Sequence, residues 1–235
     1  MSDFKSWNQK SHATDWLLFA QNLGANLALD ETAFSNGDLY TILTNKKAKG
    51  KKGAIVAMVK GTKAEAVIKI LHKIPVKQRK KVKEVTLDMA GNMGLIVKKS
   101  FPNASLVIDR FHVQKLALDA LQEIRISHRW EALDNENDAI EYARNKSLRY
   151  SPELLSNGDT LKQLLARSRY LLYKSSSKWT ENQSKRAEIL FQRYPDLEKA
   201  YKLCQNLSWI FNNTKDKTSA LIRLAKWDEK VRQAA

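Results

Sequence analysis

The sequence has very little cysteine. Its 235 residues include one cysteine, Cys204, and four histidines that lie far apart. A single thiol excludes a disulfide framework and is typical of proteins in a reducing compartment. The scattered histidines and lone cysteine also give no zinc-ligand spacing. Cys204 falls on the apolar stripe of an expected helix, so we interpret it as a small core residue rather than a nucleophile.

Long apolar runs are also missing. The longest compact run, 54–59, is far too short to span a membrane. The N-terminus, MSDFKSWNQK, lacks the apolar segment of a signal peptide, so we expect no membrane among the partners. Neither of two glycine-containing segments is a complete phosphate-binding motif. Residues 91–94 lack the full glycine pattern of a dinucleotide-binding turn, and residues 61–63 lack the remaining glycine of a P-loop.

Positive charge is abundant. The formal net charge is +16 and the isoelectric point is near 9.8. Such a charge attracts polyanions, of which nucleic acid is the commonest, although a solvated basic surface is the alternative. Hydrophobic residues make up 43% of the chain, which is enough for a core and argues against disorder.

The first half of the chain predicts an α/β fold with a mixed sheet. Strands are expected at 23–30, 38–44 and 54–60, joined by an Asn36–Gly37 turn and a lysine-rich loop into an antiparallel meander. A crossover helix then begins at Thr62, which forms a capping-box pattern with Glu65, and ends at Pro75. Two further strands, 82–88 and 104–109, flank a helix that Gly91 opens and Pro102 closes.

The remainder predicts helices only. Apolar stripes occur at 113–124 and 161–172, and Thr180 with Gln183 forms a capping box for a helix that ends at Pro195. Two more helices are expected near 196–211 and 216–233. We therefore expect three parts: an N-terminal arm, 1–22, with loosely helical spacing near 13–21, an α/β core, 23–148, and a helical region, 149–235. The aromatic residues of the arm are expected to pack on the core: Phe4, Trp7, Trp16 and Phe19.

Three of the predicted strands end on an aspartate: Asp30, Asp88 and Asp109. Carboxylates at one edge of a sheet are typical of a site for hard cations, because neighbouring carboxylates that stay ionised repel each other unless a cation lies between them. Two Mg²⁺ ions about 4 Å apart can activate a water or hydroxyl and stabilise the leaving oxygen of a phosphodiester. The alternative is that each aspartate caps a turn or a helix.

The neighbours of these aspartates leave alternative roles open. Glu31 follows Asp30 and, in a strand, faces the opposite side, so we interpret it as structural or as a support behind the ligands. Asp109 is a third ligand, or it pairs with Arg110, or it caps the next helix. His112 either orients a group of the site or is structural at a helix start.

Basic clusters are candidates for contact with nucleic acid, because lysine and arginine neutralise phosphates and aromatic rings stack on unpaired bases. The alternative for each cluster is a solvated face. The candidates are Lys46, Lys47, Lys49, Lys51, Lys52, Lys77, Arg79, Lys80, Arg167, Arg169, Lys178 and Trp179.

Three segments resemble DDE transposases of bacterial insertion sequences, in the branch called ISL-three: LALDETAFSNGDLYTILTNK, VKEVTLDMAGNM and LVIDRFHVQKLALDALQEIR. The stretch DRFHVQK is the most specific. The resemblance implies a ribonuclease H-like domain interrupted by a helical insertion, which agrees with the predicted element order. It also implies metal-dependent cleavage and transfer of DNA strands, in which water nicks the element ends and the freed 3′-hydroxyl attacks target DNA.

The resemblance matches Asp30 and Asp88 to the family's first two catalytic aspartates, and Asp109 to the aspartate of its DRFH motif, with Arg110 and His112 beside it in supporting or structural roles. It implies Mg²⁺ or Mn²⁺ as cofactor. The implied partners are the ends of an insertion sequence, target DNA, and a second copy or a complementing transposase chain. The implied location is the bacterial cytoplasm, with nucleoid association when bound to DNA.

The sequence departs from the family pattern in two places. The family's catalytic glutamate, on a late helix and followed shortly by asparagine and lysine, has no counterpart before Ala235, since Glu198 and Glu229 lack that context. The family's N-terminal DNA-binding region is also missing. We therefore expect a catalytic core that is incomplete at both ends. The alternatives are an inactive transposase that binds only DNA or a partner, and a stand-alone nuclease with Asp109 as its third carboxylate.

Overall fold

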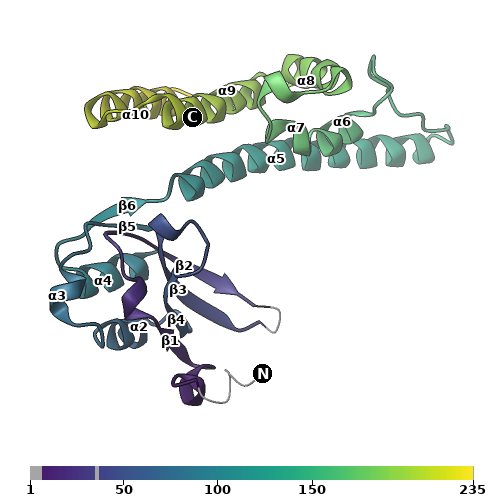
Figure 1. The fold of residues 1–235 in the computed structure, drawn as a ribbon. Coiled ribbons are helices and arrows are strands. Elements are labelled where there is room, and N and C mark those ends of the chain that lie inside the picture. Colours follow the sequence, from purple (N-terminus) through teal and green to yellow (C-terminus); the bar gives the residue numbers. More distant parts are fainter. Residues whose placement is uncertain (1–6, 35–36, 235) are drawn as a thin grey trace. The chain divides into compact units, whose positions relative to one another are not determined.

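The structure, a computed structural model, describes residues 7–34 and 37–234. Its contacts divide the chain into two compact units, Met1–His112 and Val113–Ala235. The first unit contains a sheet and short helices, and the second contains helices (Figure 1). The division falls in the first turns of a long helix rather than near residue 148, where the sequence predicted the start of the helical region.

The first unit is built on a six-stranded mixed sheet, which confirms the prediction of an α/β fold. Its strand order is β1-β4-β3-β2-β5-β6. The pairs β1–β4, β4–β3 and β3–β2 are antiparallel, whereas the pairs β2–β5 and β5–β6 are parallel. The strand bounds are Trp16–Leu18 (β1), Asn26–Ala33 (β2), Leu39–Asn45 (β3), Ile55–Lys60 (β4), Glu84–Leu87 (β5) and Ser105–Ile108 (β6).

The core of this unit lies between the sheet and its helices. The helices are α2 (Ala64–Leu71), the short α3 (Val76–Arg79) and α4 (Gly91–Ser100), with single 3₁₀ turns η1 (Lys10–His12), η2 (Ala20–Asn22) and η3 (Lys46–Ala48). Alternate strand residues such as Leu29 and Leu87 are buried with Val67 of α2 and Ile96 of α4. The intervening residues, such as Thr86, point to the opposite face and stay partly exposed.

Strand β1 replaces the helical turn that the sequence predicted near 13–21. Trp16 pairs with Val59 and thereby covers the outer edge of β4, which would otherwise present unpaired backbone groups. The ring of Trp16 packs on the core, as predicted for the arm, and stacks on His12 with 3.5 Å between ring centroids. Phe4 lies outside the described residues. Three residues are too few for alternation to show in a sequence.

Helix α2 begins one residue later than the capping-box pattern predicted. Lys63 occupies its N-cap position and makes no side-chain cap, so the role expected of Thr62 is wrong. The preceding residue is still held by the sheet, because the Gly61 N–H donates to Leu39 O (2.7 Å) and its carbonyl accepts from Thr41 Oγ1 (2.8 Å). The helix also ends before Pro75, which instead precedes α3.

Strand β2 runs past Asp30 to Ala33, so the strand predicted at 23–30 begins and ends three residues later than expected. Its last residues pair with β3, up to Ala33 opposite Leu39, as one arm of a hairpin. Gly37 adopts a φ of +80° in the turn, which suits glycine, and Asn36 lies outside the described residues.

The second unit is helical, as predicted. Its elements are α5 (Arg110–Asn145), α6 (Leu161–Arg167), α7 (Arg169–Leu172), η4 (Ser176–Lys178), α8 (Glu181–Arg193), α9 (Pro195–Asn213) and α10 (Lys217–Arg232). The capping box is confirmed: Gln183 N donates to Thr180 Oγ1 (3.3 Å) and Thr180 N donates to Gln183 Oε1 (3.2 Å). Pro195 begins α9 at its first turn, where no backbone donor is needed. No helix among the described residues is long and apolar enough to cross a membrane.

A buried carboxylate ties α6 to α8 in this unit. The side chain of Asp159, only 2% exposed, accepts hydrogen bonds from Arg167 Nη1, from Arg186 Nε at 3.1 Å and from Asn157 Nδ2 at 2.9 Å. The apolar core of this unit is formed by side chains of several helices, which include Leu164, Leu165, Leu171, Leu172 and Leu190.

Candidate active site and basic surfaces

Three aspartates follow the last ladder pairs of the parallel half of the sheet. These last pairs are Leu29 with Leu87, between β2 and β5, and Leu87 with Ile108, between β5 and β6. The next residue of each strand is an aspartate: Asp30, Asp88 and Asp109. Because neighbouring strands are about 4.8 Å apart, the three backbone positions form a row at one level of the sheet. We call Asp30, Asp88 and Asp109 the aspartate row.

Local backbone donors orient each carboxylate of the row. Oδ1 of Asp30 accepts from Glu31 N (2.8 Å), and Oδ1 of Asp88 accepts from Ala90 N (2.8 Å). Oδ1 of Asp109 accepts from the N–H of residue 111 in the first turn of α5 (2.9 Å). The turn and capping contacts that were the alternative to a metal site are thus present, and each of them uses one oxygen. In Asp30 and Asp88 these contacts involve Oδ1, and carboxylate oxygens suit a hard cation.

Glu31 belongs to the electrostatic surroundings of the row, although its strand position alternates with that of Asp30. Burial raises the pKa of the Glu31 carboxyl above its ordinary value, and the negative charges of Asp88 and then Asp30 raise it further. Within 7–34 and 37–234, no three histidine, cysteine or acidic side chains are grouped closely enough to hold a metal.

Arg110 and His112 lie in the first turn of α5, directly after the row. Arg110 is exposed, and the His112 N–H donates to the Asp109 carbonyl at 3.1 Å. The imidazole makes an edge-on contact with Phe111, with 5.6 Å between ring centroids. Both residues are therefore placed beside Asp109 by the start of the helix.

All five lysines of the loop between β3 and β4 are solvent-exposed, and four of them are Lys47, Lys49, Lys51 and Lys52. The fifth, Lys46, reaches β5, where its Nζ donates to Thr86 Oγ1 (2.8 Å) and pairs with Glu84 (3.1 Å). Thr86 is two residues before Asp88 and on the open face of the sheet. Lys46 thus brings a positive charge to the strand that carries the central member of the aspartate row.

The second predicted basic cluster, Lys77, Arg79 and Lys80, contains both exposed and buried side chains. Lys77 and Lys80 are exposed, but Arg79 is 9% exposed and is a correction to the expected DNA contacts. Its Nε donates to Ile74 O at 3.0 Å and its Nη1 to Ser100 O at 2.6 Å. This guanidinium ties the start of α3 to the end of α4, so it is not presented to solvent.

The helical cluster also separates into exposed and structural members. Arg169 and Lys178 are exposed, whereas Arg167 is bound to the buried Asp159. Trp179 is a correction as well: its Nε1 donates to Leu171 O at 2.8 Å and its ring stacks on Tyr201 with 5.4 Å between centroids. Because this ring packs in the helical core, it is not available to stack on bases.

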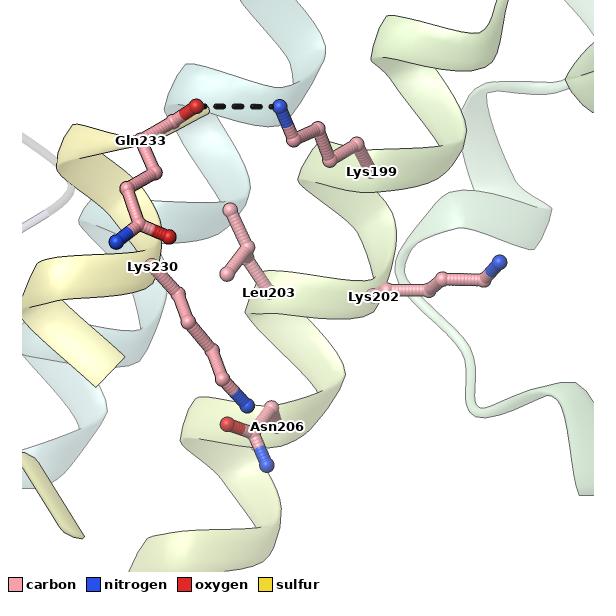
Figure 2. Close-up of a pocket in the computed structure, with 6 residues that line it drawn as sticks. All are labelled: Lys199, Lys202, Leu203, Asn206, Lys230 and Gln233. Carbon is pink, nitrogen blue, oxygen red and sulfur yellow. Dashed lines mark hydrogen bonds between the residues drawn. The ribbon is translucent and has the colours of Figure 1, made fainter. Parts of the chain in front are cut away.

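One basic hollow was missed by sequence reasoning. It lies between α9 and α10, has a volume of about 500 Å³ and is lined by Lys199, Lys202 and Lys230 (Figure 2). Lys199 Nζ donates to the Gln233 carbonyl at 3.3 Å, and Lys202 pairs with Glu198 at 2.7 Å. The spacing of three residues between Lys199 and Lys202 places them on one helix face and is the signal that would have found them.

Comparison with known proteins gives one match. The family model of the ISL-three DDE transposases, described as "Transposase", matches residues 27–235. The match spans both compact units and all three positions of the aspartate row. No curated protein and no solved structure matches the chain.

Proposed function

The chain belongs to the ISL-three family of DDE transposases, and from this premise we propose that its α/β unit performs the phosphoryl transfer of DNA transposition, with Asp30 and Asp88 as ligands of divalent cations. The observation that carries the proposal is the aspartate row. It sets carboxylates from adjacent parallel strands at one level of the sheet.

The donor set fits a hard cation. Carboxylate oxygens are the ligands that Mg²⁺ prefers, and Mg²⁺ retains several waters, so few protein ligands suffice. When bound, Mg²⁺ or Mn²⁺ supplies Lewis-acid stabilisation of the charge on the scissile phosphate. The backbone N–H groups of Glu31 and Ala90 hold the carboxylates of Asp30 and Asp88 in orientation through one oxygen each. The family activity implies water as the first nucleophile and a DNA 3′-hydroxyl as the second.

Asp109 is the in-chain candidate for a third carboxylate. It follows the ladder on the strand next to Asp88, and its N–H donates to Leu87 O at 2.8 Å, which continues the β5–β6 pairing to this level. Glu31 lies in the field of Asp30 and Asp88 and adds negative charge that a cation would neutralise. We propose Asp109 as ligand and Glu31 as support.

The DNA substrate implied by the family suits the basic composition. We propose that the exposed lysines of the loop between β3 and β4, with Lys77 and Lys80, contact phosphates near the α/β unit. Their exposure and the net charge of +16 support this role. In the helical unit, Arg169 and Lys178 remain as candidates after the corrections above.

The test is strand cleavage by the purified chain. Labelled DNA carrying the ends that flank its reading frame is incubated with Mg²⁺ or Mn²⁺, with EDTA as the metal-free control. Asp30→Asn and Asp88→Asn should each lower cleavage on the order of 100-fold or more, because loss of a ligand costs at least as much as loss of a residue that orients one. DNA affinity should stay within about twofold.

Asp228→Asn is the matched control, since Asp228 is an exposed aspartate in the helical unit. It should leave cleavage unchanged. Unaltered cleavage in both Asp30→Asn and Asp88→Asn would overturn the metal-site assignment. Absence of cleavage by the unmodified chain, with salt-sensitive DNA binding retained, would favour the alternative of a transposase that binds DNA without cutting it. Loss of cleavage in Asp109→Asn would identify the third carboxylate.

A further inference from the structure

A groove runs beside the N-terminal half of α5 within the helical unit. It consists of two hollows of about 550 and 700 Å³. Arg169 lines the first and Lys178 the second, and Tyr173 lines both. The α5 residues along it recur at helical spacing, from Gln114 through Leu118 and Gln122 to Trp130, so the groove follows one face of the helix.

Large aromatic rings of the groove are exposed. Trp130 is 60%, Trp209 50% and Tyr173 41% exposed. Trp209 is held in place on one side by Arg223, whose guanidinium lies 4.9 Å from the ring centroid and donates to Thr214 Oγ1 at 2.9 Å. Exposed rings in a concave surface mark a binding site, because apolar area of this kind is usually buried in a core.

Three arginines gather at the first hollow without ion-pair partners among the described residues: Arg125, Arg129 and Arg169. Arg125 is buried and fixed by hydrogen bonds to Gln122 Oε1 (2.7 Å) and Leu165 O (3.0 Å). Burial lowers the pKa of its guanidinium, and the charges of Arg129 and Arg169 lower it further. A bound anion would relieve this repulsion.

Acidic residues do not cancel this charge. Asp119 also lines the hollow, but it pairs with Lys115 at 3.0 Å, and Glu123 is one carboxylate against three guanidinium groups. The groove therefore combines exposed ring faces with positive charge. Proteins that bind single strands use this combination, stacking bases on aromatic rings while a basic surface follows the backbone.

We propose that this groove binds an unpaired DNA strand, with bases stacked on Trp130 and Tyr173 and phosphates contacting Arg129, Arg169 and Lys178. A duplex does not fit this role, because its base faces are covered by their neighbours. The inference rests on the proposed function, since a cleaved strand that separates from its complement supplies unpaired nucleotides to this protein.

The experiment measures binding of the whole chain in EDTA, so that cleavage does not contribute. A short labelled single strand and the matching duplex are titrated by fluorescence anisotropy. Trp130→Ala should weaken single-strand binding by roughly tenfold, which is typical of one lost stacking contact. It should change duplex affinity by less than about twofold. Tyr142→Ala is the matched control, because Tyr142 is 64% exposed on the same helix and lies outside the groove.

Two further variants separate stacking from folding and charge. Trp130→Tyr keeps an aromatic face and should restore single-strand affinity, which a fold defect at this position would not allow. Arg129→Gln should reduce the slope of log K against log salt by about 0.7 on the single strand, corresponding to one phosphate contact.

Equal losses on single strand and duplex, or the same loss in Tyr142→Ala, would overturn the proposal. The outcome is independent of the aspartate row. Single-strand binding that depends on Trp130, in a chain that does not cleave DNA, would leave the groove assignment standing and contradict the proposed function alone. Cleavage that depends on Asp88 without such binding would do the reverse.

Discussion

Replacing Arg79 by methionine should destabilise the α/β unit while leaving its DNA affinity unchanged. Arg79 lies in a basic run between Lys77 and Lys80. These two lysines are exposed, whereas the guanidinium of Arg79 is buried. It donates to the carbonyls of Ile74 and Ser100, at 3.0 and 2.6 Å. Methionine fills a similar volume without these donors, so the change removes the hydrogen bonds and leaves most of the side-chain packing.

The expected cost follows from those two contacts. A hydrogen bond that involves a charged group contributes about 1.5–3 kcal/mol. Ile74 and Ser100 are both fully buried, so water does not readily replace the lost donor, and the two hydrogen bonds together contribute at least about 3 kcal/mol. With a urea m-value of about 2 kcal/mol/M, the unfolding midpoint should fall by about 1.5 M.

Urea unfolding followed by circular dichroism measures the stability, and anisotropy with labelled duplex DNA measures the affinity. The controls are Lys77→Met and Lys80→Met, which should stay within about 0.5 kcal/mol of the unmodified chain because both side chains are exposed. If the replaced lysine contacts a phosphate of the duplex, its variant should lower the slope of log K against log salt concentration by about 0.9. A stable Arg79→Met variant with weakened DNA binding would refute the structural role of this arginine.

Two further predictions concern the helical unit. Asp159→Asn should lower the unfolding free energy by about 2–3 kcal/mol, which is less than is usual for a broken buried ion pair because Arg167 is half exposed. The control Asp228→Asn, at an exposed residue, should change the unfolding free energy by less than about 0.5 kcal/mol. Urea titration of the two variants makes the comparison. Burial raises the pKa of the Cys204 thiol to about 11, so this thiol should resist a thiol-reactive disulfide reagent at pH 8 until the chain is unfolded. Because the folded pKa lies above the unfolded one, stability should also decline as pH rises from 9 towards 11, and rapid labelling of the native chain would contradict the assignment.

The sequence predicted the parts of the fold that rest on periodicity and end signals. Alternation located the strands β3 and β4 to within a residue of their observed starts, and the Thr180 capping box placed the start of α8. These signals suffice because each is set by residues close together in the chain. The ladder pairs of Leu29, Leu87 and Ile108 precede the three aspartates, of which Asp88 and Asp109 follow strand ends and Asp30 lies within β2.

The sequence failed where a distant part of the chain decides the outcome. The pattern at Thr62 has the residues of a capping box, but two hydrogen bonds from β3 hold Gly61 in the sheet and delay the helix. Arg79 and Trp179 carry the residue types of a DNA-binding surface, and only the packing of α4 and of Tyr201 shows that they face inward.

The way in which the aspartate row is generated has a consequence for how this scaffold tolerates change. Helices α2 and α4 lie in the connections that lead into β5 and β6, whereas the row is fixed by ladder pairs within the strands. Residues added to a connection, for example between Ile74 and Val82, would lengthen a surface segment and leave the row aligned. One residue added inside β5 would instead move Asp88 by a full level and turn it to the opposite face. Length variation should therefore be common in the crossovers. It should be absent from β5, from β6 and from the part of β2 that pairs with β5, because these segments set the positions of the three carboxylates.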